Sequence, residues 1–112
     1  MEIRGAQDIR YFKLEIFIPE THFSLLQKAL QEADAGHIGN YDSCLSYYPV
    51  TGCWRPLLGT HPYLGKENEI SQASEFKVET CCKRENLEKT ILAIKAIHPY
   101  EEPVINIIPL AN

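Results

Sequence analysis

The sequence predicts one α+β domain whose strands and helices follow each other in the order β-α-β-β-α-β. Its 112 residues suit a single domain. Four segments have the composition or alternation of strands, and two others carry apolar residues at helical spacing. We therefore treat residues 1–112 as one domain and expect residues 1–10, which show no periodicity, to form a loose segment before it.

Residues 11–35 have the patterns of a strand followed by a helix. Residues 11–18 are rich in aromatic and β-branched residues, with charges at alternate positions 13 and 15, and Pro19 follows. Between positions 20 and 35 the apolar residues fall on one helical face, and Gly36 suits the end of that helix. These patterns predict a strand over 11–18 and a helix over 20–35.

Two extended segments precede the second helix. Residues 41–48 end at Pro49, and residues 75–81 alternate polar and apolar side chains. An apolar stripe over 85–97 predicts a helix that Pro99 closes. Residues 104–108 form a short apolar strand between two prolines, which favours an edge position in the sheet.

This order is the split βαβ, or ferredoxin-like, arrangement: a four-stranded antiparallel sheet with two helices on one face. Thr, Tyr, Cys and Phe side chains on several strands should leave the opposite face partly apolar, which predicts an oligomer. A long connection over 50–64, between the second and third strands, holds the single tryptophan. It is either a functional or docking loop, or Trp54 and Leu57 cover an exposed edge of the core.

Charge and cysteine pattern exclude several classes of partner. The net charge is −4 and no basic stripe is present, so nucleic acid is not an expected partner. No apolar run approaches the ~20 residues of a membrane span, and the start lacks a signal peptide, so we expect no membrane partner and a cytoplasmic location. The four cysteines form no C-x-x-C pair, which favours reduced thiols over zinc or disulfides.

Candidate chemistry gathers in residues 36–44 and 98–103. Imidazole, thiolate and carboxylate groups are ligands for a divalent cation, and the candidates here are His37, Cys44, His98 and Glu101. The alternative is that the carboxylates of 98–103 cap backbone amides or pair with Arg55. Cys44 with His37 or His98 is the one nucleophile-and-base pair that we find, and no catalytic motif accompanies it, so no catalytic residue is assigned.

Three motifs resemble a known family. They are Gly-His-Ile-Gly-Asn-Tyr-Asp-Ser-Cys at 36–44, Thr-Gly-Cys-Trp-Arg-Pro-Leu-Leu-Gly at 51–59 and His-Pro-Tyr-Glu-Glu-Pro at 98–103. Over residues 11–110 the chain resembles the PII/CutA-like domain inserted in YqfO-type members of the NIF-three (NGG-interacting factor three) family. The resemblance implies a stand-alone ferredoxin-like domain that associates as a trimer. It does not imply the family's two-metal site, which belongs to a flanking domain.

The resulting hypothesis is a non-catalytic, trimeric binding or regulatory module with its ligand in clefts between subunits. The expected ligand is a divalent metal or a small molecule, and the ligand-binding candidates are His37, Tyr41, Arg55, Tyr100 and Glu102. One alternative is a hydrolase that depends on a metal or on Cys44. Another is a pure assembly protein that docks through its sheet face to a partner not identified by the sequence.

Overall fold

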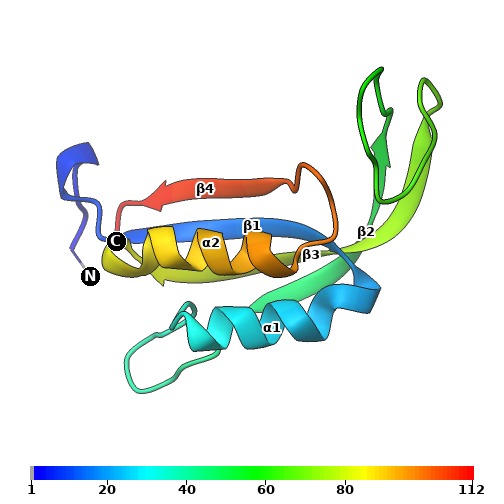
Figure 1. Cartoon of the computed structure of the whole chain (residues 1–112). Helices are drawn as coiled ribbons and strands as arrows, with labels where there is room; N and C mark the ends of the chain where they lie inside the picture. Colours follow the sequence, from blue (N-terminus) through cyan, green and yellow to red (C-terminus); the bar gives the residue numbers. More distant parts are fainter. Residues whose placement is uncertain (1) are drawn as a thin grey trace.

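The structure, a computed structural model, describes residues 2–112 and contains one four-stranded sheet and two helices (Figure 1). The elements are β1 (Tyr11–Pro19), α1 (Phe23–Glu32), β2 (Ser46–Trp54), β3 (Ser71–Lys83), α2 (Leu87–Ile97) and β4 (Ile105–Leu110). The strands are antiparallel in the order β2-β3-β1-β4, and both helices cover one face of the sheet. The predicted ferredoxin-like fold is confirmed.

The core lies between the two central strands and the helices. Alternate residues of β1 point to the helices, so Leu14, Ile16 and Ile18 are fully buried. Val78 of β3 and Ile94 of α2 close the same cluster. Burial of each such side chain contributes about 1.5–3 kcal/mol relative to exposure, so the β1–β3 pair anchors the fold.

The second strand is displaced from the predicted one. Residues 41–45 lie outside it, and the strand continues through Pro49 to Trp54. Proline is accommodated there because β2 is an edge strand with a neighbour on one side, where a missing N–H breaks little pairing. The β2–β3 connection therefore begins at residue 55, and the expected start at residue 50 is wrong.

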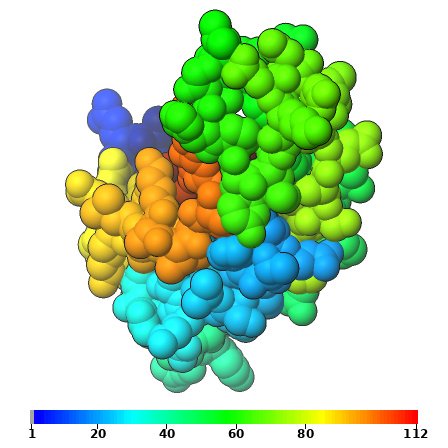
Figure 2. Space-filling model, turned by 45° about the vertical axis from the view of Figure 1, so that its right-hand side comes forward, coloured from blue at the N-terminus to red at the C-terminus, as the bar shows by residue number. Residues whose placement is uncertain are grey.

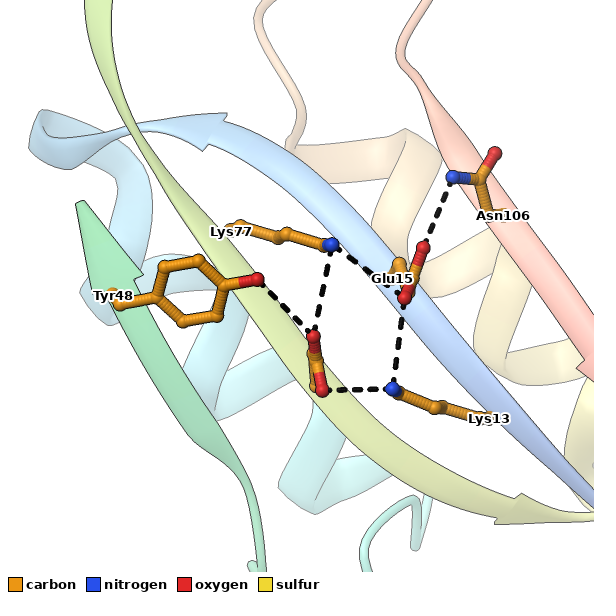
Figure 3. Close-up of polar contacts among 6 residues, drawn as sticks. Lys13, Glu15, Tyr48, Lys77 and Asn106 are labelled. Atoms are coloured by element: carbon orange, nitrogen blue, oxygen red, sulfur yellow. Dashed lines mark hydrogen bonds and ion pairs between the residues drawn. The ribbon is translucent and has the colours of Figure 1, made fainter. Parts of the chain in front are cut away.

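The open face of the sheet is partly apolar, as expected, with Phe17, Tyr48 and Ile108, but it carries a charged cluster at its centre. The β1–β3 register places Lys13, Glu15, Lys77 and Glu79 side by side on this face (Figure 3). Lys13 Nζ lies 2.9 Å from Glu79 and 3.6 Å from Glu15, while Lys77 Nζ lies 3.6 Å from Glu15 and 3.8 Å from Glu79. The hydrogen bond from Lys13 lowers the pKa of Glu79 and raises the pKa of Lys13.

The segment before β1 is tied to the rest of the chain. A 3₁₀ turn covers Ala6–Asp8, the Arg4 N–H donates to the Ala111 carbonyl at 2.6 Å, and the Arg84 guanidinium donates to the Ile9 carbonyl at 2.7 Å. The described part of the segment that we expected to be loose, residues 2–10, is thus in contact with the end of the chain and with Arg84. Within residues 2–112, the helices are too short or too polar to cross a bilayer.

Candidate functional site

The β2–β3 hairpin projects beyond the sheet, and its loop folds back onto the segment that follows α2 (Figures 1 and 2). The Trp54 indole N–H donates to the Leu64 carbonyl at 3.2 Å within the hairpin. The Glu101 carboxylate accepts a hydrogen bond from the His61 backbone N–H at 2.6 Å, across forty residues of sequence. The first bond closes the loop on itself, and the second holds it over residues 98–103.

A pocket of about 510 Å³ lies between the hairpin, the end of β1 and residues 100–104. Its apolar wall comes from Phe17, Trp54, Leu57, Tyr63 and Leu64, among others. Its polar groups are Arg55, Glu75, Tyr100, Glu101 and Glu102. The volume lies within the range of ordinary small-molecule sites, roughly 300–1,000 Å³.

Tyr100 is the centre of an aromatic cluster in this pocket. Its ring centroid lies 5.8 Å from that of Trp54, 6.0 Å from that of Tyr63 and 5.0 Å from that of His98. The Tyr100 hydroxyl is buried beside the Glu75 carboxylate and makes no hydrogen bond of standard geometry among residues 2–112. Burial, and next the adjacent Glu75 carboxylate, raise the pKa of this hydroxyl far above its usual value, so it stays protonated.

His98 positions Tyr100. Its Nε2–H donates to the Phe17 carbonyl at 2.7 Å, and its Nδ1 accepts from the Tyr100 backbone N–H at 3.2 Å. An accepting Nδ1 fixes the Nε2–H tautomer. Burial lowers the pKa of His98, although the bond to Phe17 opposes this effect, so the neutral imidazole is favoured. Both ring nitrogens are therefore engaged by backbone groups of this chain.

Glu75 contributes a buried carboxylate to the same pocket. Glu75 is 5% exposed and forms no ion pair among residues 2–112. Its carboxylate lies against Gly52, where a Cβ would collide with it, so glycine at position 52 makes room for the charge. A buried carboxylate without a cation is costly, and no ion pair among residues 2–112 offsets this cost for Glu75.

The predicted site residues lie at two opposite ends of the folded molecule. Arg55, Tyr100, Glu101 and Glu102 line the pocket, and His98 supports it from behind. His37, Tyr41 and Cys44 lie in the α1–β2 loop, at the end opposite the hairpin (Figure 1). That loop is hydrogen-bonded to Thr80 and Cys81 of β3. These two residues lie five and six positions along the strand from Glu75, so the loop is about 17–20 Å from the pocket at ~3.3 Å per residue.

The four metal-ligand candidates form no common site within one chain. His37 bonds through its two ring nitrogens to Asp34 (2.9 Å) and the Gly39 carbonyl (3.0 Å), and Cys44 Sγ donates to the Asp42 carbonyl at 3.7 Å. Residues 2–112 contain no group of three or more His, Cys, Asp or Glu side chains placed to hold a metal. Cys44 and His37 also make no hydrogen bond with each other, and Glu101 caps a backbone amide, as the alternative interpretation expected.

Sequence reasoning missed Glu75 and assigned Trp54 no role in a pocket. One signal for Glu75 was available: Gly52 lies inside a strand, where glycine often marks a close approach of another group. The burial of Glu75 itself follows from the fold of the hairpin over residues 98–103, which the sequence alone does not indicate.

Comparison with known proteins relates the chain to a larger class of bacterial proteins. No protein-family model matches it. It is 41% identical over 101 residues to the GTP cyclohydrolase 1 type 2 homolog of Halalkalibacterium halodurans, covering 90% of this chain and 27% of that protein. The homolog of the same name from Bacillus subtilis is 33% identical over 98 residues, covering 88% and 26%. The chain thus spans about a quarter of the length of these relatives.

Solved structures give the same result. A Bacillus cereus protein related to NIF3 superposes with a TM-score of 0.81 at 34% identity, covering 93% of this chain and 26% of that one. The divalent cation tolerance protein CutA of Archaeoglobus fulgidus has a TM-score of 0.67 at 21% identity, covering 91% and 85%. GlnK of B. subtilis has a TM-score of 0.63 at 18% identity, covering 91% and 86%. The chain therefore has the ferredoxin-like fold of CutA and PII-like proteins and is related in sequence to one segment of the NIF3-related proteins.

Proposed function

We propose that the chain is a non-catalytic, self-associating module that binds a small ligand in the pocket between the hairpin loop and residues 98–103. The pocket itself carries this proposal: about 510 Å³ lined by aromatic rings, with a buried hydroxyl that has no hydrogen-bond partner of standard geometry and a buried carboxylate that forms no ion pair, both among residues 2–112. Partnerless buried polar groups are rare in folded proteins and call for an explanation, which a ligand supplies.

We propose further that three copies associate and that the ligand lies at a boundary between them. The trimer is what the resemblance to PII/CutA-like domains implies. The chain supports self-association through two exposed sheet edges, β2 and β4, which present unpaired backbone groups. The α1–β2 loop with His37 and Tyr41 lies at the end opposite the pocket, so these residues can reach a ligand there only from a neighbouring chain.

A divalent cation is the second ligand class under this proposal. Both ring nitrogens are engaged in His98, by backbone groups, and in His37, by Asp34 and the Gly39 carbonyl. A metal held by His37 and Cys44 of one chain with Glu101 of another would therefore have to displace one of the His37 bonds. We place the module in the cytoplasm, where its four cysteines, all free in the structure, stay reduced.

Native mass spectrometry of freshly purified protein, without chelator, tests both parts. We expect a trimer that carries additional mass. If a chelator removes that mass, and His37→Ala but not the exposed-site control His61→Ala abolishes it, the ligand is a metal. A monomer at every concentration would overturn the subunit-cleft proposal.

The pocket is tested separately by amide chemical shifts. A panel of small compounds should move the amide signals of residues 54–64 and 100–104. In a monomer that binds a compound, the signals of residues 36–44 should stay unchanged, because these residues can reach the pocket only from a neighbouring chain. Shifts that never include residues 54–64 would overturn the assignment of the pocket.

A further inference from the structure

We propose, on the basis of the binding function above, that the pocket takes an organic cation: a protonated amine or quaternary ammonium group seated between Glu75 and the rings of Trp54 and Tyr100. The apolar part of the compound lies against the hairpin wall, which includes Leu57 and Leu64.

The buried charge of Glu75 is the first argument. Lys77, two residues along β3 on the same face, is directed at Glu15 and Glu79 and not at Glu75 (Figure 3). Arg55, the cation of the pocket lining, is exposed and makes no ion pair among residues 2–112. A carboxylate that is 5% exposed and lacks a cation is stabilised when a ligand supplies one.

The aromatic rings are the second argument. Trp54, Tyr63 and Tyr100 form a connected cluster in the pocket, with Trp54–Tyr100 and Tyr63–Tyr100 centroid distances of 5.8 and 6.0 Å. The faces of Trp and Tyr rings attract cations, and a group of such rings beside a carboxylate is a recognised solution for ammonium ligands. The neutral Tyr100 hydroxyl can accept an N–H from the protonated amine, whereas a quaternary ammonium group would rely on the rings and on Glu75.

The balance of charge in the lining agrees with this class of ligand. The pocket lining contains three carboxylates and one arginine; the carboxylates belong to Glu75, Glu101 and Glu102. The Glu101 carboxylate accepts a hydrogen bond from the His61 N–H, and Glu75 and Glu102 form no ion pair among residues 2–112. An anion would meet this excess of negative charge, so the lining selects cations.

The same features predict an unusual pattern of variants. Glu75→Gln removes an unpaired buried charge, and Tyr100→Phe removes an unpaired buried hydroxyl, so neither should lower the melting temperature of the ligand-free protein. Both should weaken cation binding. Stability that is unchanged or raised while binding falls identifies groups kept for a ligand and not for the fold.

The test uses three probes of one shape and different charge: phenethylamine, phenethyl alcohol and phenylacetate. Trp54 is the single tryptophan and lines the pocket, so its fluorescence reports binding directly at neutral pH. We expect the amine to bind at least about tenfold more tightly than the alcohol, as a charge-assisted hydrogen bond provides, and phenylacetate to bind least.

Variants assign the preference to named groups. Glu75→Gln should reduce amine affinity by about tenfold and leave alcohol affinity within about twofold. Glu67→Gln, an exposed carboxylate of the hairpin loop outside the pocket, is the matched control and should change neither. Arg55→Gln should tighten amine binding, because it removes the cation of the lining.

Each contrary result is informative. Equal affinity for amine and alcohol, or an amine affinity unaffected by Glu75→Gln, would overturn the inference that the ligand is a cation. The proposal that the pocket binds a small ligand would stand. If phenylacetate binds most tightly and Arg55→Gln abolishes its binding, the pocket is an anion site and the inference of a cation ligand is wrong. Failure of all three probes to change Trp54 fluorescence overturns the cation inference; the proposed function falls with it only if the compound panel also leaves residues 54–64 unshifted.

Discussion

Replacement of His98 by alanine should destabilise the chain by an amount that depends on pH. The imidazole links two parts of the structure, the Phe17 carbonyl of β1 and the Tyr100 backbone N–H, at 2.7 and 3.2 Å. His98 is 8% exposed, so water cannot replace these bonds fully. Two lost hydrogen bonds, one to an acceptor left buried, give about 2–3 kcal/mol at neutral pH.

The sign of the pH dependence follows from the direction of the pKa shift. Burial lowers the pKa of His98 in the folded chain, against an ordinary value near 6.5 when unfolded. Below about pH 6.5 the unfolded chain takes up a proton that the folded chain resists, so this contribution to wild-type stability is lost as the pH falls. His98→Ala lacks that contribution, and the difference between wild type and variant should shrink on acidification.

Urea unfolding followed by circular dichroism, at one protein concentration and at several pH values, measures this difference. In thermal unfolding at neutral pH, the melting temperature should fall by about 8–24 °C, since about 1 kcal/mol corresponds to ~4–8 °C in a domain near this size. His61→Ala removes an exposed imidazole and is the control, because all other titrating groups are common to the two variants. A wild-type to His98→Ala difference that is constant from neutral to acidic pH would refute the reasoning.

Three further substitutions test other parts of the structure. Gly65→Ala forces an alanine into φ +104° and against the Ser71 side chain, and should cost about 1–3 kcal/mol in urea unfolding; an unchanged midpoint would contradict the backbone geometry. Glu101→Ala releases the His61 N–H at an exposed position, so it should speed proteolysis and amide exchange of residues 55–70 while global stability changes by no more than about 1 kcal/mol; a large global loss would contradict a local tether. Ile94→Ala opens a cavity in the core and should cost about 2–5 kcal/mol; a loss below about 1 kcal/mol would contradict its full burial.

The element order was predictable because periodicity reports burial directly. The alternation of β1 and the apolar stripe of α2 follow from one buried face each, and both appear where the sequence places them. The bounds of β2 were not predictable in this way. Its residues are mostly exposed, so alternation is weak, and Pro49 indicates a strand end unless the strand is known to lie at an edge.

Features that depend on strand register or on contacts between distant segments could not be predicted from the sequence. Lys13 and Glu79 meet only because β1 and β3 pair with Glu15 opposite Glu79, which period-two alternation does not specify. The pocket depends on the bond between Glu101 and the His61 N–H, two residues that no local pattern connects. Sequence reasoning did select Arg55, Tyr100 and Glu102, because polar residues between prolines and in a long loop often carry function.

The hydrogen bond between the Arg4 N–H and the Ala111 carbonyl has a topological consequence. It places the first described residues beside the last, as the N and C labels of Figure 1 show. A unit whose ends are adjacent can be spliced into a surface loop of another protein, since the host sees two attachment points side by side and loses little chain entropy in closing around them. The same arrangement leaves the hairpin, which forms one wall of the pocket, at the end of the molecule far from both termini.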